Sequence, residues 1–284
     1  MTWAGGRFGT GAECVLAPNA NLMTLDGTNT WVLRDPASDR SVVVDPGPLD
    51  DGHLAAVADV AGDVQAVLLT HHHLDHSEAS RAFAERVGCG VRALDPAYRL
   101  GDEGLGEGDV VAVGDLEVHV IATPGHTSDS LSFLVPADRA VLTGDTVLGR
   151  GTTVVAHPDG QLGAYLHSLD RLHRLAEAHE IGTIWPGHGP VIDEALPALD
   201  FYLAHRAERL AQVEQAVLAL AGEDTLAAAM RHLDLEAGTG ASLTPRTVVE
   251  RVYADVDPVL WGAAELSVRA QLAHLAQRDR DAAR

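Results

Sequence analysis

The pattern of apolar and polar residues over the first two hundred positions predicts short strands that alternate with helices. Residues 64–69 form an apolar run rich in valine and leucine, which is typical of a buried strand. We therefore expect an α/β (α+β) fold. Further strands are predicted at residues 31–33, 41–44, 91–94, 109–113, 116–121, 131–135, 140–142 and 181–185, and helices at residues 49–60, 77–87 and 162–175.

The pattern changes after Pro197, where long alanine- and leucine-rich segments show helical spacing. Two prolines, Pro245 and Pro258, fall near predicted helix starts, where proline is tolerated because the first turn needs no backbone donor. We expect a domain boundary near residue 200, with one domain at 1–199 and a small helical domain at 200–284. The predicted C-terminal helices are residues 198–221, 224–233, 245–253 and 258–277.

The chain of 284 residues carries 41 acidic residues against 20 arginines and no lysine, which gives a net charge of −21. Such a charge disfavours non-specific binding of nucleic acid, which depends on neutralising phosphates, but it does not exclude a local basic cleft. From residue 200 onward there are 9 arginines against 13 acids (net −4), and before it 11 against 28 (net −17). Neither part is basic.

Two cysteines, Cys14 and Cys89, are too few for a disulfide framework or a cysteine-based zinc site. A reducing cytoplasm is the simpler interpretation. Residues 1–13 are rich in glycine and lack the apolar core of a signal peptide. No stretch approaches the ~18 apolar residues of a membrane span. We therefore expect a soluble cytoplasmic protein with no membrane partner.

A dense group of metal-binding side chains follows the predicted strand at residues 64–69. His71, His73, Asp75 and His76 lie within six positions. Imidazole and carboxylate are ligands that zinc accepts, and they also suit manganese and iron. On an extended segment His71 and His73 point the same way, whereas adjacent residues in a turn can face different directions. The stretch can therefore supply two ions rather than one.

Three later residues share one context, a glycine-containing turn directly after a predicted strand. They are His126 in a Pro-Gly-His-Thr sequence, Asp145 in Gly-Asp-Thr and His188 in Pro-Gly-His-Gly. Glycine lets the backbone bend sharply and approach a site closely. We therefore expect several strand ends to deliver ligands to one polynuclear site. His72, between His71 and His73, is expected not to bind metal.

These motifs, in this order, resemble the metallo-β-lactamase superfamily over roughly residues 15–195. The resemblance implies a four-layer αββα sandwich, a site for two divalent metal ions, and a supporting role for Asp45. Zinc is the expected metal, with manganese or iron as alternatives. The implied ligands are His71, His73 and His126 at the first ion, Asp75, His76 and His188 at the second, and Asp145 bridging both.

Residues 22–31 are similar to the opening of the β-lactamase-like protein 2 subfamily, whose members carry a small C-terminal winged-helix-like domain. In that subfamily the mitochondrial member is a single-strand RNA endonuclease, and some fungal relatives are thioesterases. Many relatives carry a further histidine where this chain has Ser128-Asp129-Ser130, so no role of that histidine transfers. Asn29, Thr127 and Ser128 are the expected substrate contacts.

Two ions about 3.5–4 Å apart can share a hydroxide and polarise the substrate, so we expect hydrolysis by a metal-bridging hydroxide. Asp75 is the expected catalytic residue, orienting the bridging water and accepting its proton. A small-molecule or acyl (thio)ester is the favoured substrate, because the charge disfavours nucleic acid. The alternatives are a single-strand endoribonuclease or phosphodiesterase and, third, a non-catalytic metal-binding module. The C-terminal domain could bind nucleic acid, form a homodimer or act as a lid.

Overall fold

The computed structural model describes residues 2–235 and 243–282, and its contacts divide the chain into two compact units. The first unit holds both β-sheets, and the second is helical. The first comprises Met1–Pro124, Asp129–Thr153 and Ser168–Leu199, and the second Gly125–Ser128, Val154–His167 and Asp200–Arg284.

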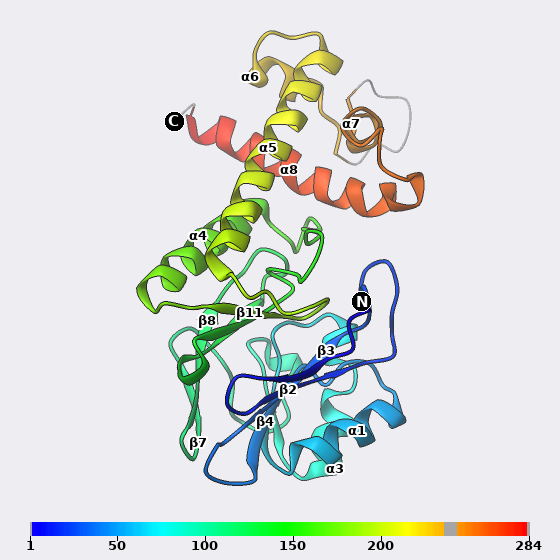
Figure 1. The fold of residues 1–284 in the computed structure, drawn as a ribbon. Helices are drawn as coiled ribbons and strands as arrows, with labels where there is room; N and C mark the ends of the chain where they lie inside the picture. The colour runs from blue at the N-terminus through cyan, green and yellow to red at the C-terminus, as the bar shows by residue number, and fades with distance from the viewer. Residues whose placement is uncertain (1, 236–242, 283–284) are drawn as a thin grey trace. The chain divides into compact units, whose positions relative to one another are not determined.

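The first unit is built on two mixed sheets (Figure 1). In the first sheet the strands follow chain order, and pairing is antiparallel from β1 to β4 and parallel from β4 to β6. In the second sheet the order is β11-β10-β9-β8-β7, and only β10 and β11 pair in parallel. The strands are β1 (Gly6–Phe8), β2 (Ala12–Leu16), β3 (Asn29–Arg34), β4 (Arg40–Val44), β5 (Asp63–Leu68), β6 (Gly90–Arg92), β7 (Val110–Val113), β8 (Leu116–Ala122), β9 (Leu131–Val135), β10 (Ala140–Gly144) and β11 (Thr183–Pro186).

Alternation along the strands produces the layers, because successive side chains point to opposite faces of a sheet. In β3, Trp31 and Leu33 join a core with Phe133 and Leu142 of the second sheet, whereas Val32 belongs to a separate cluster on the other face. The space between the sheets is therefore filled by side chains from both. This arrangement confirms the αββα expectation once the outer helices are added.

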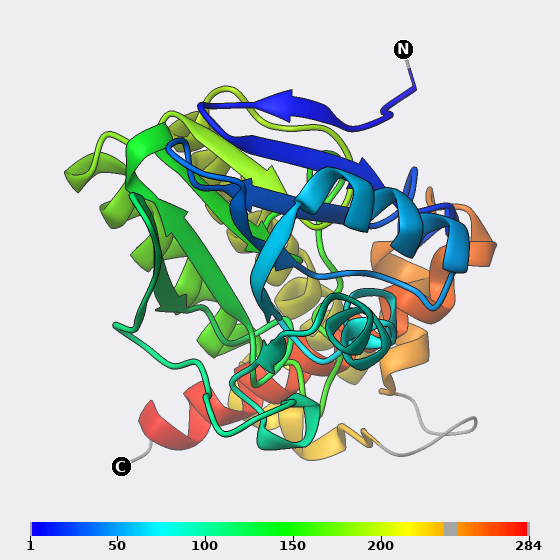
Figure 2. The same ribbon diagram turned by 90° about the horizontal axis from the view of Figure 1, so that it is seen from below.

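Helices cover the outer faces of both sheets. The helices α1 (Asp51–Ala61) and α3 (Ser80–Val87) lie beside the first sheet (Figure 2). Leu54 and Val57 of α1 and Phe83 of α3 pack in the outer cluster of that sheet. On the second sheet, Arg171 of α4 (Leu162–Ala178) donates a hydrogen bond to the carbonyl of Ala122 at the end of β8, 3.2 Å away. Two 3₁₀ turns, η1 (Pro96–Tyr98) and η2 (Pro136–Asp138), lie in the connections.

The helix predicted at residues 77–87 is wrong in its start. The chain instead forms a short helix, α2 (Leu74–Ser77), and then α3. The break has a tertiary cause, because Gly47 donates its N–H to the carbonyl of His76 and accepts from the N–H of Ala79. β1 and β2 were not predicted, because β1 is only three residues long and the short apolar run of β2 is interrupted by Glu13.

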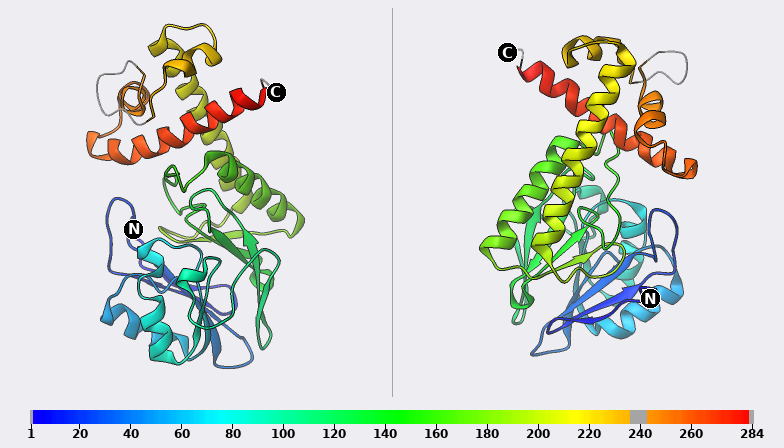
Figure 3. Two further views of the ribbon diagram at one scale, coloured as in Figure 1. Left: turned by 180° about the vertical axis from the view of Figure 1, so that it is seen from behind. Right: turned by 45° about the horizontal axis from the view of Figure 1, so that its top comes forward.

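The helical unit, whose helices are drawn in Figure 3, has a core of its own. Val213 and Val217 of α5 (Ala195–Ala221) pack with Val249 of α7 and with Val268 and Leu272 of α8. The helix predicted at 224–233 is shorter than expected and ends in a 3₁₀ turn. The remaining elements are α6 (Leu226–Ala229), η3 (Met230–His232), α7 (Pro245–Val252), η4 (Pro258–Leu260) and α8 (Trp261–Ala282).

Proline and threonine fix the start of α7 as the sequence suggested. Pro245 is the first helical residue, and the Thr244 hydroxyl accepts a hydrogen bond from the N–H of Thr247 at 3.2 Å.

The boundary near residue 200 stays a prediction, and α5 runs through it without interruption. Within the described residues, every helix falls short of the length and apolar character that a bilayer span needs. Cys14 and Cys89 are both free thiols.

The packing of the core between the sheets predicts that substituting two different leucines by alanine will change the free energy of unfolding by very different amounts. Leu142 is 1% exposed in β10, whereas Leu49 is 61% exposed. We expect Leu142→Ala to lower the free energy of unfolding by about 2–5 kcal/mol, because it leaves a cavity. Leu49→Ala is the matched control and should change it by less than about 0.5 kcal/mol. Urea titration measures both, and equal losses would contradict the assigned packing.

Candidate metal centre

The ends of four strands in the first unit carry the candidate residues. Asp45 follows β4, the His71 segment follows β5, Asp145 follows β10, and His188 lies two residues beyond β11. β4 runs parallel to β5 and β10 runs parallel to β11, so the carboxyl ends of each pair meet at one edge.

The seven predicted ligands form three overlapping groups of side chains. Within each group the potential ligand atoms all lie within 4.8 Å of one another, and most of the side chains are buried. Within the described residues these are the groups that could hold a metal ion, and His72 belongs to none of them. The groups are His71, His73 and His126; His71, His76 and Asp145; and Asp75, His76 and His188.

The carboxylate of Asp45 orients two of these rings from behind. It is 2% exposed, and its Oδ1 accepts from the N–H of Thr70 at 2.8 Å. Its Oδ2 accepts from the Thr70 hydroxyl at 2.6 Å and from His76 Nδ1 at 2.8 Å. The Thr70 oxygen in turn accepts from His71 Nδ1 at 3.0 Å. Each ring therefore carries its proton on Nδ1 and keeps Nε2 for a ligand bond.

A hydrogen bond at Nδ1 orients the ring of His188 in the same way. Its Nδ1 donates to the carbonyl of Gly27 at 3.1 Å, so its Nε2 faces the site as a lone pair. That nitrogen lies 3.2 Å from Nε2 of His76 and 3.1 Å from a carboxylate oxygen of Asp75. Asp145 oxygens lie 3.4 Å from His76 Nε2 and 3.5 Å from His188 Nε2.

This donor set fits a divalent cation. Two unprotonated Nε2 atoms and two carboxylates cannot share so small a space without positive charge between them, because their lone pairs repel. His71 Nε2 and His73 Nδ1, 3.1 Å apart, converge in the same manner. Nitrogen and oxygen ligands in this number suit zinc, manganese or iron.

In the metal-free protein, protons on the histidines supply the positive charge that a bound cation would provide. Burial alone would lower the pKa of His188, but Asp145 and Asp75 raise it to about 9. Burial alone would raise the pKa of Asp75, but His76 and His188 lower it to about 2. The carboxylates also hold the pKa of His76 well above its usual value despite complete burial. A metal ion must therefore displace protons when it binds.

The three expected substrate contacts differ in their surroundings. Asn29 is fully buried, and its amide donates to the carbonyls of Pro186 and Gly189, while its contact with substrate stays a prediction. Thr127 is also fully buried. Ser128 is exposed and donates through its hydroxyl to Asp159 at 2.5 Å. Contact of Thr127 or Ser128 with substrate stays a prediction.

Two residues with a place at the site were not predicted. Thr70 joins Asp45 to His71, and the one available signal was its position directly before the histidines. Asp129 lies shortly after the Pro-Gly-His-Thr motif, and its carboxylate pairs with His72 Nδ1 at 2.7 Å. This pairing directs the His72 ring away from the ligand groups.

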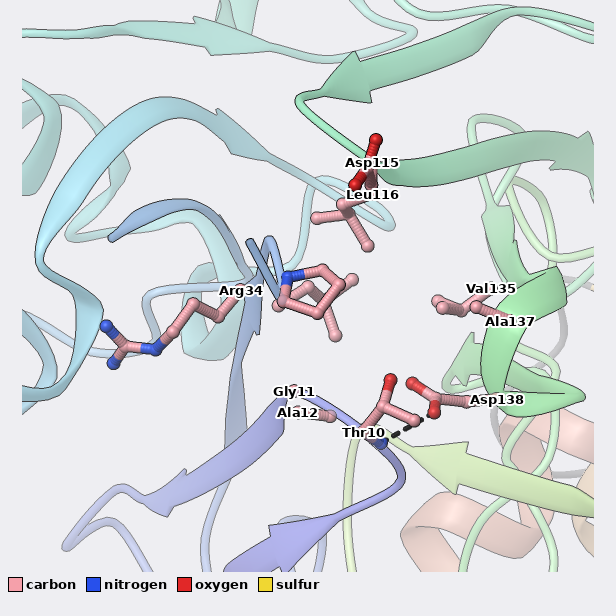
Figure 4. Close-up of a pocket in the computed structure, with 11 residues that line it drawn as sticks. Thr10, Gly11, Ala12, Arg34, Asp115, Leu116, Val135, Ala137 and Asp138 are labelled. Atoms are coloured by element: carbon pink, nitrogen blue, oxygen red, sulfur yellow. Dashed lines mark hydrogen bonds between the residues drawn. The ribbon is translucent and has the colours of Figure 1, made fainter. Parts of the chain in front are cut away.

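A separate hollow lies at the far end of the sandwich, near the turn between β3 and β4 (Figure 4). Its walls include Leu33, Leu116 and Val135, and Asp138 accepts from the N–H of Thr10 at its mouth. The enclosed space is about 20 Å³, which suits about one water molecule. It is too small for a substrate.

Two protein families match parts of the chain. Residues 23–210 match the family described as Metallo-beta-lactamase superfamily. Residues 244–280 match the Beta-lactamase associated winged helix domain. The first match spans well over half of the chain, and the second lies in the helical unit.

Curated relatives and solved structures agree with these matches. A Caenorhabditis elegans protein named Beta-lactamase-like protein 2 homolog is 33% identical over 213 residues, which cover 69% of this chain and 67% of the relative. The Atrochrysone carboxyl ACP thioesterase of Aspergillus fumigatus is 34% identical over 191 residues, covering 63% of this chain and 56% of the relative. The chain thus spans less than two thirds of that thioesterase. The structure of a Beta-lactamase domain protein from Burkholderia ambifaria shares the fold, with a TM-score of 0.76 at 20% identity, covering 98% of this chain and 90% of that one.

Metal affinity should rise with pH until about pH 9. Below the raised pKa of His188, a proton occupies the position that the ion needs, so each proton displaced changes the affinity about tenfold per pH unit. Calorimetric zinc titrations in buffers of different ionisation enthalpy count the protons released. Binding at pH 7 without proton release would contradict the raised pKa of His188, and the part of the dependence that comes from His188 should flatten above about pH 9.

Asp45→Asn should weaken metal binding by about 10–100-fold, the usual effect of losing a residue that orients a ligand. An amide has one accepting oxygen, so it cannot satisfy the three donors that the carboxylate now receives. Asparagine also tolerates the positive φ of 50° at this position. Competition with a chromophoric chelator measures the affinity.

Asp35→Asn is the matched control for that measurement. Asp35 is also a buried aspartate that accepts several hydrogen bonds, but it lies at the opposite end of the first sheet. Its variant should bind metal as the wild type does. If Asp45→Asn also retains full affinity, the orienting role of Asp45 is wrong.

Proposed function

This chain is a hydrolase that belongs to the metallo-beta-lactamase superfamily, and on that premise we propose that it uses two divalent metal ions, zinc first among them, to hydrolyse a small-molecule or acyl thioester. The observation that carries the proposal is the convergence of Asp75, His76 and His188 beside Asp145. A carboxyl ACP thioesterase among the relatives supports the substrate class.

Different residues would hold each of the two metal ions. His71, His73 and His126 would hold one ion, while Asp75, His76 and His188 would hold the other, with Asp145 between them. Ions bound there would lower the pKa of a shared water and polarise the scissile carbonyl. The rings of His76 and His188 exclude solvent from their side of the site, since they are 0% and 1% exposed.

Asp75 is the carboxylate best placed to handle the proton of the attacking water. Its side chain is 30% exposed, against 12% for Asp145, so it is the one open toward solvent and substrate. Asp75 is ionised at neutral pH and can accept a hydrogen bond from water, while its lowered pKa makes it a weak base, so orienting the water is its main part. We assign it the orientation of that water and the acceptance of its proton.

Charge favours an acyl substrate over nucleic acid. The chain carries −21 overall, and the part from residue 200 onward carries −4. Binding RNA through its phosphates would require a basic surface. Residues 244–280 match a winged-helix domain, and a role for them in nucleic-acid binding or dimer formation stays to be tested. A cytoplasmic location also stays a prediction.

A substrate panel tests the proposal directly. Metal-analysed protein should hydrolyse an acyl thioester faster than a phosphodiester or single-stranded RNA. Asp75→Asn should lower kcat by about 10²–10⁴-fold, the usual contribution of a general base. Asp51→Asn is the control, because Asp51 is 95% exposed at the start of α1 and should leave kcat unchanged.

Two outcomes would count against this assignment. Cleavage of RNA in preference to thioester would transfer the protein to the phosphodiesterase class. Near-wild-type turnover of Asp75→Asn with full metal occupancy would remove Asp75 from the mechanism.

A further inference from the structure

Hydrogen bonds from several segments hold the backbone around His188, residues 186–189, and the buried Asn29 makes three of them. Its Nδ2 donates to the carbonyls of Pro186 and Gly189, at 2.9 and 2.8 Å, and its backbone N–H donates to the carbonyl of Gly187 at 2.8 Å. Asn29 therefore binds three of the four carbonyl groups in the loop that presents the histidine. A misplaced Asn29 would leave these carbonyls without their donors and shift the loop.

The orientation of the Asn29 amide depends on Trp3. The indole Nε1 of Trp3 donates to Asn29 Oδ1 at 2.7 Å. Because an indole N–H can only donate, this contact requires the amide oxygen on the Trp3 side and sends the amide N–H groups toward the loop. Trp3 lies before β1, outside the metal centre and far from His188 in the sequence.

A series of aromatic rings holds Trp3 in place. Trp3 contacts Phe8 with ring centroids 5.7 Å apart, Phe8 meets Trp31 edge-on at 5.6 Å, and Trp31 stacks on Trp185 at 5.2 Å. The Trp31 indole also donates to the carbonyl of Pro186 at 3.1 Å. The rings and the hydrogen bonds thus connect Trp3 to the same loop by two routes.

Small movements of this loop would reach the ligands. A Cβ placed on Gly187 would lie 2.6 Å from an oxygen of Asp145 and 2.8 Å from Cε1 of His76, so the loop already packs against both. The His188 ring depends on the same backbone, because its Nδ1 must reach the carbonyl of Gly27.

We propose that Trp3 and Asn29 are positioning residues that set the place of His188 and thereby the affinity for the second metal ion. The assignment rests on the proposed two-metal function. It concerns the ion held by Asp75, His76 and His188, and it leaves the ion at His71 and His73 unaffected.

Two conservative variants test the assignment. Trp3→Phe keeps an aromatic ring beside Phe8 but removes the N–H that orients Asn29. Asn29→Asp keeps the shape and still accepts from Trp3, but it cannot donate to the loop carbonyls. We expect each to weaken the second zinc by roughly tenfold or more and to leave the first unchanged.

The matched control is Trp261→Phe in the helical unit. It also removes an indole N–H that donates to backbone carbonyls, those of Tyr253 and Val256, but at a distance in the chain from every ligand. Zinc stoichiometry and stepwise dissociation constants are the readout, with His188→Ala and His71→Ala as references for the loss of each ion. Trp3→Phe and Asn29→Asp should titrate like His188→Ala, and Trp261→Phe like the wild type.

The other possible results would each overturn either the positioning assignment or the proposed function. Two wild-type affinities in Trp3→Phe, or an equal loss at both ions, would overturn the assignment, since general destabilisation affects both. If Asn29→Asp fails to fold, Trp3→Phe alone decides. A wild-type protein that binds fewer than two ions overturns the proposed function itself, which separates that failure from a failure of the positioning role.

Discussion

The buried carboxylate of Asp45 accepts hydrogen bonds from the backbone and hydroxyl of Thr70 and from the ring of His76, and the candidate metal centre is organised around it. Burying a charge costs on the order of several kcal/mol unless it is fully satisfied, so these contacts are needed for the fold as well as for the site. They join the end of β4 to the end of β5 and to the short helix α2. Through Thr70 the same carboxylate also orients His71.

The sandwich brings distant residues together because its strand ends meet. The ligands come from segments more than a hundred residues apart, yet His76 and His188 lie with their Nε2 atoms 3.2 Å apart. Close approach of the backbone is essential here. Gly144, with φ of 47°, packs directly against Thr70, and no larger residue would fit between them without displacement.

Much of the fold could be predicted from the chain because the hydrophobic pattern is strong in the central strands. β3, β4 and β5 were predicted within one or two residues, since buried strands leave apolar runs. The short β1 and β2 gave no such signal, because their strand geometry comes from pairing, β2 with β3 and β1 with β2. The break between α2 and α3 was also hidden, because it is made by hydrogen bonds from Gly47.

The sequence by itself determined the residue types of the site, since a cluster of histidines and aspartates at strand ends has few purposes other than binding metal. It also determined the helical character of the C-terminal part, through periodicity that local geometry alone requires. Only the tertiary structure shows the contacts of Asn29, which the sequence suggested as a substrate contact. Its amide is turned toward the backbone of the His188 loop by Trp3, and hydrogen bonds between segments so far apart leave no periodic trace in the chain.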